Sequence, residues 1–61
     1  MVKVDFKWHI HSRTFDMPVV PRVGETVTLE SEGVYSRLVE NVSYLVEADG
    51  ETTAIVKLAD Y

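Results

Sequence analysis

The sequence predicts an all-β fold: a small, partly open antiparallel barrel of about five strands, formed by residues 1–61 as a single domain. The clearest sign is a strict two-residue period at the start. Apolar side chains fill every even position from Val2 to Ile10, with Lys, Asp and His between them. Successive side chains of a strand point to opposite faces, so this segment has one buried face. Short turn signals recur along the rest of the chain, as expected for successive short strands.

The first strand is expected over residues 2–11, with Trp8 among its core side chains, and Ser12 and Arg13 are expected to form a tight turn. The second strand follows over residues 14–20. Its core side is expected to carry Phe15, Met17 and Val19. Pro18 lacks an amide donor, so this strand is expected at an edge of the sheet or bulged there.

The last three strands are expected over residues 26–30, 34–47 and 52–59. Gly24 and Gly33 supply the turns before the first two of them, since glycine adopts positive φ readily. An Ala-Asp-Gly loop before the last strand is the clearest hairpin signal in the chain. A helix through Leu38, Val42 and Leu45 is the alternative for the long segment. Its many valines and tyrosines favour a strand.

The long fourth strand leaves two registers open. Uninterrupted alternation forces Glu40 inward. A bulge at Glu40 and Asn41 instead places Leu38 and Leu45 outside, and long curved strands of small barrels often carry such a bulge, which favours this second register. The inward set is then Tyr35, Val39, Val42, Tyr44 and Val46.

Composition bears on several classes of function. Ten acidic against six basic residues give a net charge of −4, so nucleic acid is not an expected partner, because binding it requires several cations on phosphates. The absence of cysteine excludes a thiolate zinc site and favours a cytoplasmic setting. No apolar run approaches the length needed to cross a bilayer, and the start lacks the pattern of an export signal, so no membrane is expected. No cofactor is expected either.

The segment Pro-Arg-Val-Gly-Glu-Thr-Val at residues 21–27, followed by Tyr-x-Arg-x-Val from residue 35, resembles small SH3-like β-barrel proteins of the phage and mobile-element type. The resemblance covers about residues 19–58. It implies an SH3-like fold and no catalytic residue. It also implies a place in a host cytoplasm, as an inhibitor or modulator of a host system or as an oligomer that binds signalling nucleotides. Fold alone does not assign either role.

Surplus apolar residues predict an interface on the last hairpin. When one side of each strand faces inward, several apolar side chains remain outside, and a contiguous set of this kind is a candidate binding surface. The predicted interface residues are Leu38 or Val39, according to the register, together with Leu45, Ile55 and Tyr61. A homo-oligomer or a protein partner is therefore expected.

Six residues are candidates for binding a partner or an anionic ligand. They are Lys7, His9, His11, Arg22, Tyr35 and Arg37. The two histidines point the same way, about 7 Å apart along a strand, and would need a third ligand such as Asp16 or Glu30 to hold a metal. The expectation is an exposed polar face with no metal.

No pattern of an enzyme is visible, because the serines lack a nucleophile-elbow context and the three glycines are dispersed. The sequence therefore predicts a non-enzymatic binding protein that acts by protein–protein contact. Two alternatives remain open. One is an oligomer that sequesters an anionic small molecule or nucleotide between subunits, and the other is a small structural or assembly protein of a virion.

Overall fold

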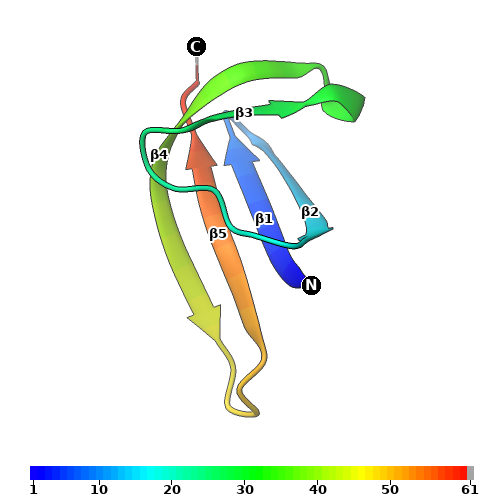
Figure 1. Cartoon of the computed structure of the whole chain (residues 1–61), viewed down its shortest axis with the longest axis vertical. Helices are drawn as coiled ribbons and strands as arrows, with labels where there is room; N and C mark the ends of the chain where they lie inside the picture. Colours follow the sequence, from blue (N-terminus) through cyan, green and yellow to red (C-terminus); the bar gives the residue numbers. More distant parts are fainter. Residues whose placement is uncertain (61) are drawn as a thin grey trace.

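The computed structural model describes residues 1–60. They form one five-stranded sheet in the order β2-β1-β5-β4-β3, curled into a half-barrel (Figure 1). The strands are β1 (Val2–Trp8), β2 (His11–Met17), β3 (Thr26–Leu29), β4 (Val34–Val46) and β5 (Thr52–Leu58), and a 3-10 turn, η1 (Glu30–Glu32), joins β3 to β4. The predicted all-β, five-stranded, partly open barrel is confirmed, and it is compatible with an SH3-like fold. Among residues 1–60, no helix has the length and apolarity that crossing a bilayer requires.

The direction of one strand pair differs from the antiparallel expectation. Three of the pairings are antiparallel, but β1 lies parallel to β5. A parallel neighbour requires a long connection, and the whole stretch from β2 to β4 supplies it. The two strands with the most buried apolar residues thereby occupy the centre of the sheet. The loop after β2 crosses in front of β1 and β5 on its way to β3 (Figure 1).

The hairpin between β1 and β2 turns three residues earlier than predicted. Trp8 pairs with His11, so His9 and Ile10 form the turn and Ser12 and Arg13 belong to β2. His9 adopts a φ of 50°, a region in which histidine is enriched among non-glycine residues. Its N–H donates a 2.7 Å hydrogen bond to Oδ1 of Asp60, which fixes the turn from the far end of the chain.

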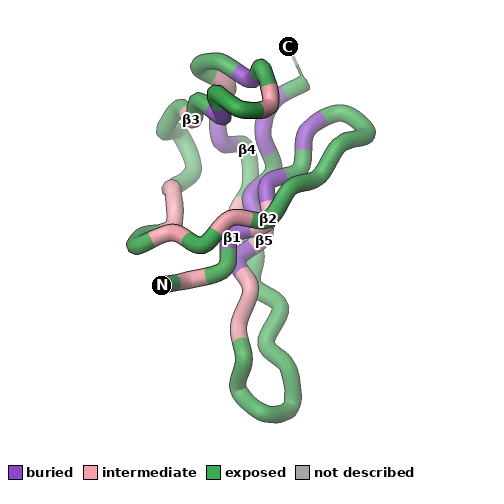
Figure 2. Tube along the Cα trace, turned by 90° about the vertical axis from the view of Figure 1, so that its right-hand side faces the viewer, coloured by how far each residue is buried: buried purple, intermediate pink, exposed green. Residues whose placement is uncertain are grey.

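The core lies on the inner face of the sheet, where residues align in rows across the strands. It comprises Val4, Phe6, Trp8, Leu29, Val34, Val39, Ala54, Val56 and Leu58. Val4, Phe6 and Trp8 of β1 are buried as predicted. The predicted inward position was wrong for Ile10, in the turn, and for Val19, beyond the end of β2, which are 84% and 66% exposed. One row runs from Phe15 through Val4 and Ala54 to Tyr44. Figure 2 shows that burial is concentrated in the middle of the sheet and that the free end of the β4–β5 hairpin is exposed.

β4 contains two irregularities, of which the sequence predicted one. The register shifts between Val39 and Asn41, so the bulged register is confirmed. A second shift lies opposite β3, where Ser36 adopts a φ of 50°. Because of this second bulge, the side chains of residues 34 and 35 point to the opposite faces from those predicted. Val34 is therefore buried and Tyr35 is 63% exposed, and the prediction that Tyr35 points inward is wrong.

The loop before β3 extends the pairing of β4 by one residue. Gly24, at a φ of 93°, donates its N–H to the carbonyl of Val39 (3.0 Å), and the N–H of Val39 donates to the carbonyl of Glu25 (2.8 Å). Because glycine tolerates this φ, the turn can bring the chain against β4. Pairing on this side of β4 therefore ends at Val39.

Candidate functional site

Within residues 1–60, the distal half of β4 pairs with another strand on one side only. β3 pairs with β4 no further than Leu38, and the loop reaches only Val39. From residue 41 to residue 46, the strand pairs of the described chain join β4 to β5 alone. Figure 1 shows this part of β4, in yellow-green, running beside β5 with its other edge open.

Backbone donors and acceptors alternate along this open edge. The N–H of Glu47 donates to the carbonyl of Glu51 (2.8 Å), which marks a hydrogen-bonded pair at the end of the hairpin. In an antiparallel ladder, the N–H and C=O of every second residue then point away from the partner strand. The residues whose backbone N–H and C=O groups point toward β5 are Asn41, Ser43 and Leu45. The residues whose backbone groups point to the open edge are Val42, Tyr44 and Val46.

Three consecutive large apolar residues are exposed beside this edge. Tyr44 is 58% exposed, Leu45 is 53% exposed and Val46 is 62% exposed. Because consecutive side chains of a strand alternate, Tyr44 and Val46 lie on the inner face and Leu45 lies on the outer face. Residues 41–46 contain no charge, proline or glycine. Native edge strands usually carry such residues to prevent pairing with another chain, so this edge is unprotected.

The outer face of the hairpin contains part of the predicted interface. Leu45 pairs with Thr53, and Ile55 pairs with Ser43, so the two apolar side chains are diagonal neighbours. Leu38 is also outside, but the Lys57–Glu40 ion pair (3.3 Å) lies between it and Ile55.

Two other predicted interface residues do not contribute to this surface. Val39 is fully buried in the core, so the inclusion of Val39 in the interface was wrong, and the outward residue of that alternative is Leu38. Its burial follows from the bulge, which keeps Val39 on the inner face beneath the loop that contains Gly24. Tyr61 lies outside the described residues.

The sequence did not single out Tyr44 and Val46 as exposed residues. Their inner-face positions were predicted correctly, but the prediction treated an inner-face position as a core position. Tyr44 ends a row whose central members, Val4 and Ala54, are fully buried. β3 does not extend far enough along β4 to cover the end of the row at Tyr44. The available signal was the length of β4, which far exceeds that of β3.

Most of the predicted ligand-binding cations already have partners within the chain. Lys7 Nζ lies 3.1 Å from Oδ2 of Asp5. Arg37 is half-buried, and its Nη1 donates to the carbonyl of Ala59 at 2.7 Å. Arg13 of β2 is also paired, because its Nη2 lies 3.4 Å from Oε2 of Glu32 in η1. These contacts separate the cations instead of gathering them around one site.

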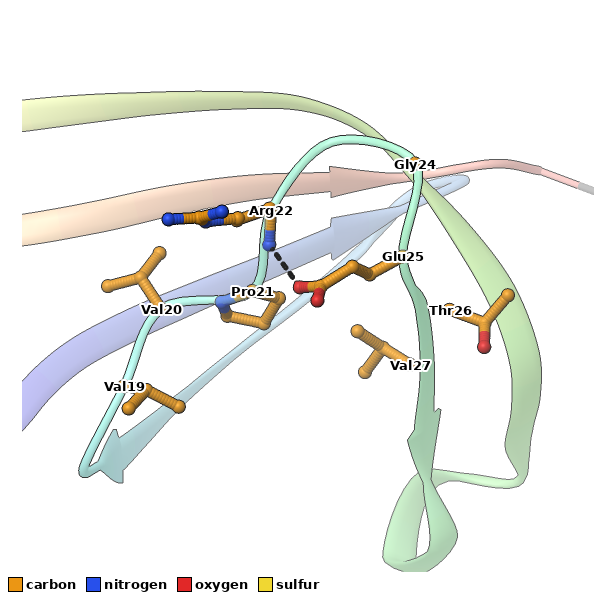
Figure 3. A pocket seen from close by; sticks show the side chains of 8 residues that line it. All are labelled: Val19, Val20, Pro21, Arg22, Gly24, Glu25, Thr26 and Val27. Carbon is orange, nitrogen blue, oxygen red and sulfur yellow. Dashed lines mark hydrogen bonds between the residues drawn. The ribbon is translucent and has the colours of Figure 1, made fainter.

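Arg22 lies on the loop before β3, where a hollow of about 760 Å³ is open to solvent. The hollow is lined by Val19, Val20, Pro21, Arg22, Gly24, Glu25, Thr26 and Val27. Figure 3 shows the Arg22 side chain extending away from Glu25, whose carboxylate accepts the backbone N–H of Arg22 at 2.7 Å. This carboxylate makes the hollow unfavourable for an anion.

The two histidines were predicted on one strand, but His9 lies in the β1–β2 turn and His11 begins β2. Their ring centroids lie 6.2 Å apart, and the His11 ring lies 5.7 Å from that of Trp8. Within residues 1–60, the group whose ligand atoms converge closely enough for a metal ion is Glu47, Asp49 and Glu51, at the exposed tip of the β4–β5 hairpin. Neither histidine belongs to this group, and exposed acidic residues commonly cluster at such a tip.

Asp60 is the one described residue with a clear shift in pKa. The hydrogen bond from the backbone N–H of His9 lowers the pKa of its carboxyl group, and the positive charge of Lys57 contributes in the same direction. The charged form of Asp60 is thus favoured in the folded protein. Its role is structural, because it joins the end of the chain to the β1–β2 turn.

No protein-family profile, no curated protein and no solved structure matches this chain. The candidate site therefore rests on the geometry of the distal half of β4.

Proposed function

We propose that this protein is a non-enzymatic binding module that acts by contact with another protein chain. The contact is made by the hairpin surface, which we define as Tyr44, Leu45, Val46 and Ile55. The observation that carries the proposal is the exposure of three consecutive large apolar residues beside an open strand edge. Contiguous exposed apolar surface on a small protein is a mark of a protein-binding site.

Sequestration of an anion is less well supported by the same geometry. Lys7 is paired with Asp5, Arg37 is bonded to the carbonyl of Ala59, and Arg22 lies next to the carboxylate of Glu25. A net charge of −4 also opposes the approach of an anion. The hairpin surface, by contrast, is uncharged and suits an apolar protein partner. A role as a phage-encoded modulator, which the resemblance implies, would be exercised through this surface.

The proposal can be tested by site-specific photo-crosslinking in cells that express the full chain. A benzophenone amino acid replaces Leu45 in one variant and Ile10 in a matched control. Both positions are exposed aliphatic residues on hairpins, but Ile10 lies outside the hairpin surface. We expect protein adducts, of this chain or of another, at position 45 and not at position 10. Equal labelling at both positions, or none at either, would contradict the proposal.

A further inference from the structure

We propose that a second copy of this chain pairs antiparallel with the open edge of β4, so that two half-barrels form one continuous sheet across a two-fold axis at Tyr44. This inference rests on the proposed function, because it names the partner of the same hairpin surface. It adds a mode of contact, strand addition through the backbone, that exposed side chains alone do not specify.

The backbone of the edge is self-complementary. Val42, Tyr44 and Val46 each direct an N–H and a C=O to the open side of β4. Opposed residues of this kind in an antiparallel ladder exchange two hydrogen bonds. With the axis at Tyr44, this residue faces its own copy and Val42 faces Val46 of the second copy. Every outward group then has a partner, as a two-fold interface requires.

Neighbouring registers satisfy fewer of these groups. An axis at Ser43 places Val46 opposite Glu40 of the second copy, which lies in the bulge. An axis at Leu45 places Val42 opposite Ala48, which lies beyond the end of β4. Only the axis at Tyr44 pairs every outward residue with an outward residue of the second copy.

The side chains at this edge also suit a second copy. Tyr44 and Val46, both more than half exposed, would pack against their counterparts on a shared inner face. Cross-strand aromatic and β-branched pairs of this type stabilise sheets. On the outer face, Leu45 would lie opposite Ser43 of the second copy, next to Ile55 of its own hairpin.

The distribution of charge on the chain permits two copies to meet along residues 41–46. Each copy has a net charge of −4, so the copies repel one another over most of their surfaces. Residues 41–46 are uncharged, and the acidic residues Glu40 and Glu47 flank them. With the axis at Tyr44, Glu47 faces Asn41 and Glu40 faces Ala48, so no carboxylate lies directly opposite another. Because the remaining repulsion is screened by ions, added salt should strengthen the dimer.

Amide hydrogen exchange followed by NMR tests the proposed contact residue by residue, beside sedimentation of the same samples. In dilute solution, we expect slow exchange at Asn41, Ser43 and Leu45, whose N–H groups face β5. We expect fast exchange at the three outward residues Val42, Tyr44 and Val46. In concentrated solution, where sedimentation shows a dimer, the outward amides should slow by at least about tenfold, in line with the fraction of paired chains.

Two tyrosine substitutions on β4 provide a matched pair of variants. Tyr44→Lys places two like charges opposite each other at the axis and should weaken dimerisation at least about tenfold. Tyr35→Lys adds the same charge at a similarly exposed position on the half of β4 that β3 covers, and should change dimerisation by less than about twofold. Val46→Lys serves as the second edge variant if Tyr44→Lys does not give a folded-protein spectrum.

Each result bears on the inference separately from the proposed function. A dimer whose outward amides still exchange fast overturns strand addition and leaves binding by the hairpin surface intact. A monomer at every concentration overturns the inference, and crosslinking at position 45 to a different protein would still support the proposed function. A monomer with no crosslinking at that position overturns both.

Discussion

The two halves of β4 are similar in apolar content and opposite in surroundings. In the first half, Val39 lies between the loop before β3 and β5 and is 0% exposed, and Val34, opposite Leu29 of β3, is 3% exposed. Tyr44 and Val46, in the second half, pair with β5 alone among the described strands and are more than half exposed. Alternation along a strand therefore assigns a side chain to a face, whereas its burial depends on whether another segment covers that face.

Truncation of one valine in each half should give the largest contrast. Val39→Ala removes fully buried methyl groups and leaves a cavity, so it should lower the free energy of unfolding by about 2 kcal/mol. Val46→Ala, at an exposed position, should lower it by less than about 0.5 kcal/mol. Urea denaturation measures both in dilute solution, where association between chains does not contribute. Equal losses would show that the second half of β4 is covered after all.

Local patterns were sufficient to predict much of the fold. Val4, Phe6 and Trp8 are buried because alternation in one strand reports directly on its faces. The bulge after Val39 also followed from local reasoning, since only a bulge keeps Glu40 out of the core. The turn at His9 and Ile10 was missed because the apolar alternation continues through it, and a contact from Asp60 holds it. The parallel pairing of β1 with β5 likewise depends on residues far apart in the sequence.

The candidate site was predictable only in part, for the same reason. Leu45 and Ile55 were placed outside correctly, since each follows from the register of its own strand. The exposure of Tyr44 depends on where β3 stops, which no local pattern in β4 reports. The role of Arg37 depended on a distant partner, the carbonyl of Ala59, whereas the carboxylate that pairs with Lys7 is two residues away on the same face of β1.

Removal of the Arg37 guanidinium should be the next largest effect, because the C-terminal segment joins the covered half of β4 through it. Arg37→Met retains much of the side-chain length but leaves the carbonyl of the buried residue Ala59 without this donor. The loss of this hydrogen bond should cost about 1.5 kcal/mol, the low end of the range for a charged donor, because Arg37 is only half-buried. Arg22→Met, on the exposed loop, is the control and should cost less than about 0.5 kcal/mol. Urea denaturation of the two variants checks the difference, and equal losses would contradict a structural role for Arg37.

The pH dependence of stability should reveal the contact between Asp60 and His9. The pKa of Asp60 is lowered in the folded protein, chiefly by the backbone N–H of His9. Its contribution is therefore fully present above the unfolded pKa, at about pH 4, and is lost as the pH falls through the lower folded value. Asp60→Asn should be less stable than the parent chain at pH 7, and the two should converge as the pH falls below the lowered pKa of folded Asp60. Melting temperatures across this range measure the effect, and a difference independent of pH would contradict it.

The smallest expected effect concerns the ion pair at the boundary between the two halves of β4. Lys57 Nζ lies 3.3 Å from Glu40 at the bulge, and both side chains are about half exposed. Exposed ion pairs contribute little and are screened by salt, so Lys57→Met should lower the free energy of unfolding by less than about 0.5 kcal/mol, and by even less in 1 M salt. The bulge is instead held by the backbone, through the bonds of Gly24 and Glu25 to Val39. A loss as large as that of Arg37→Met would mean that the ion pair positions the bulge, and hence determines where the covered half of the strand ends.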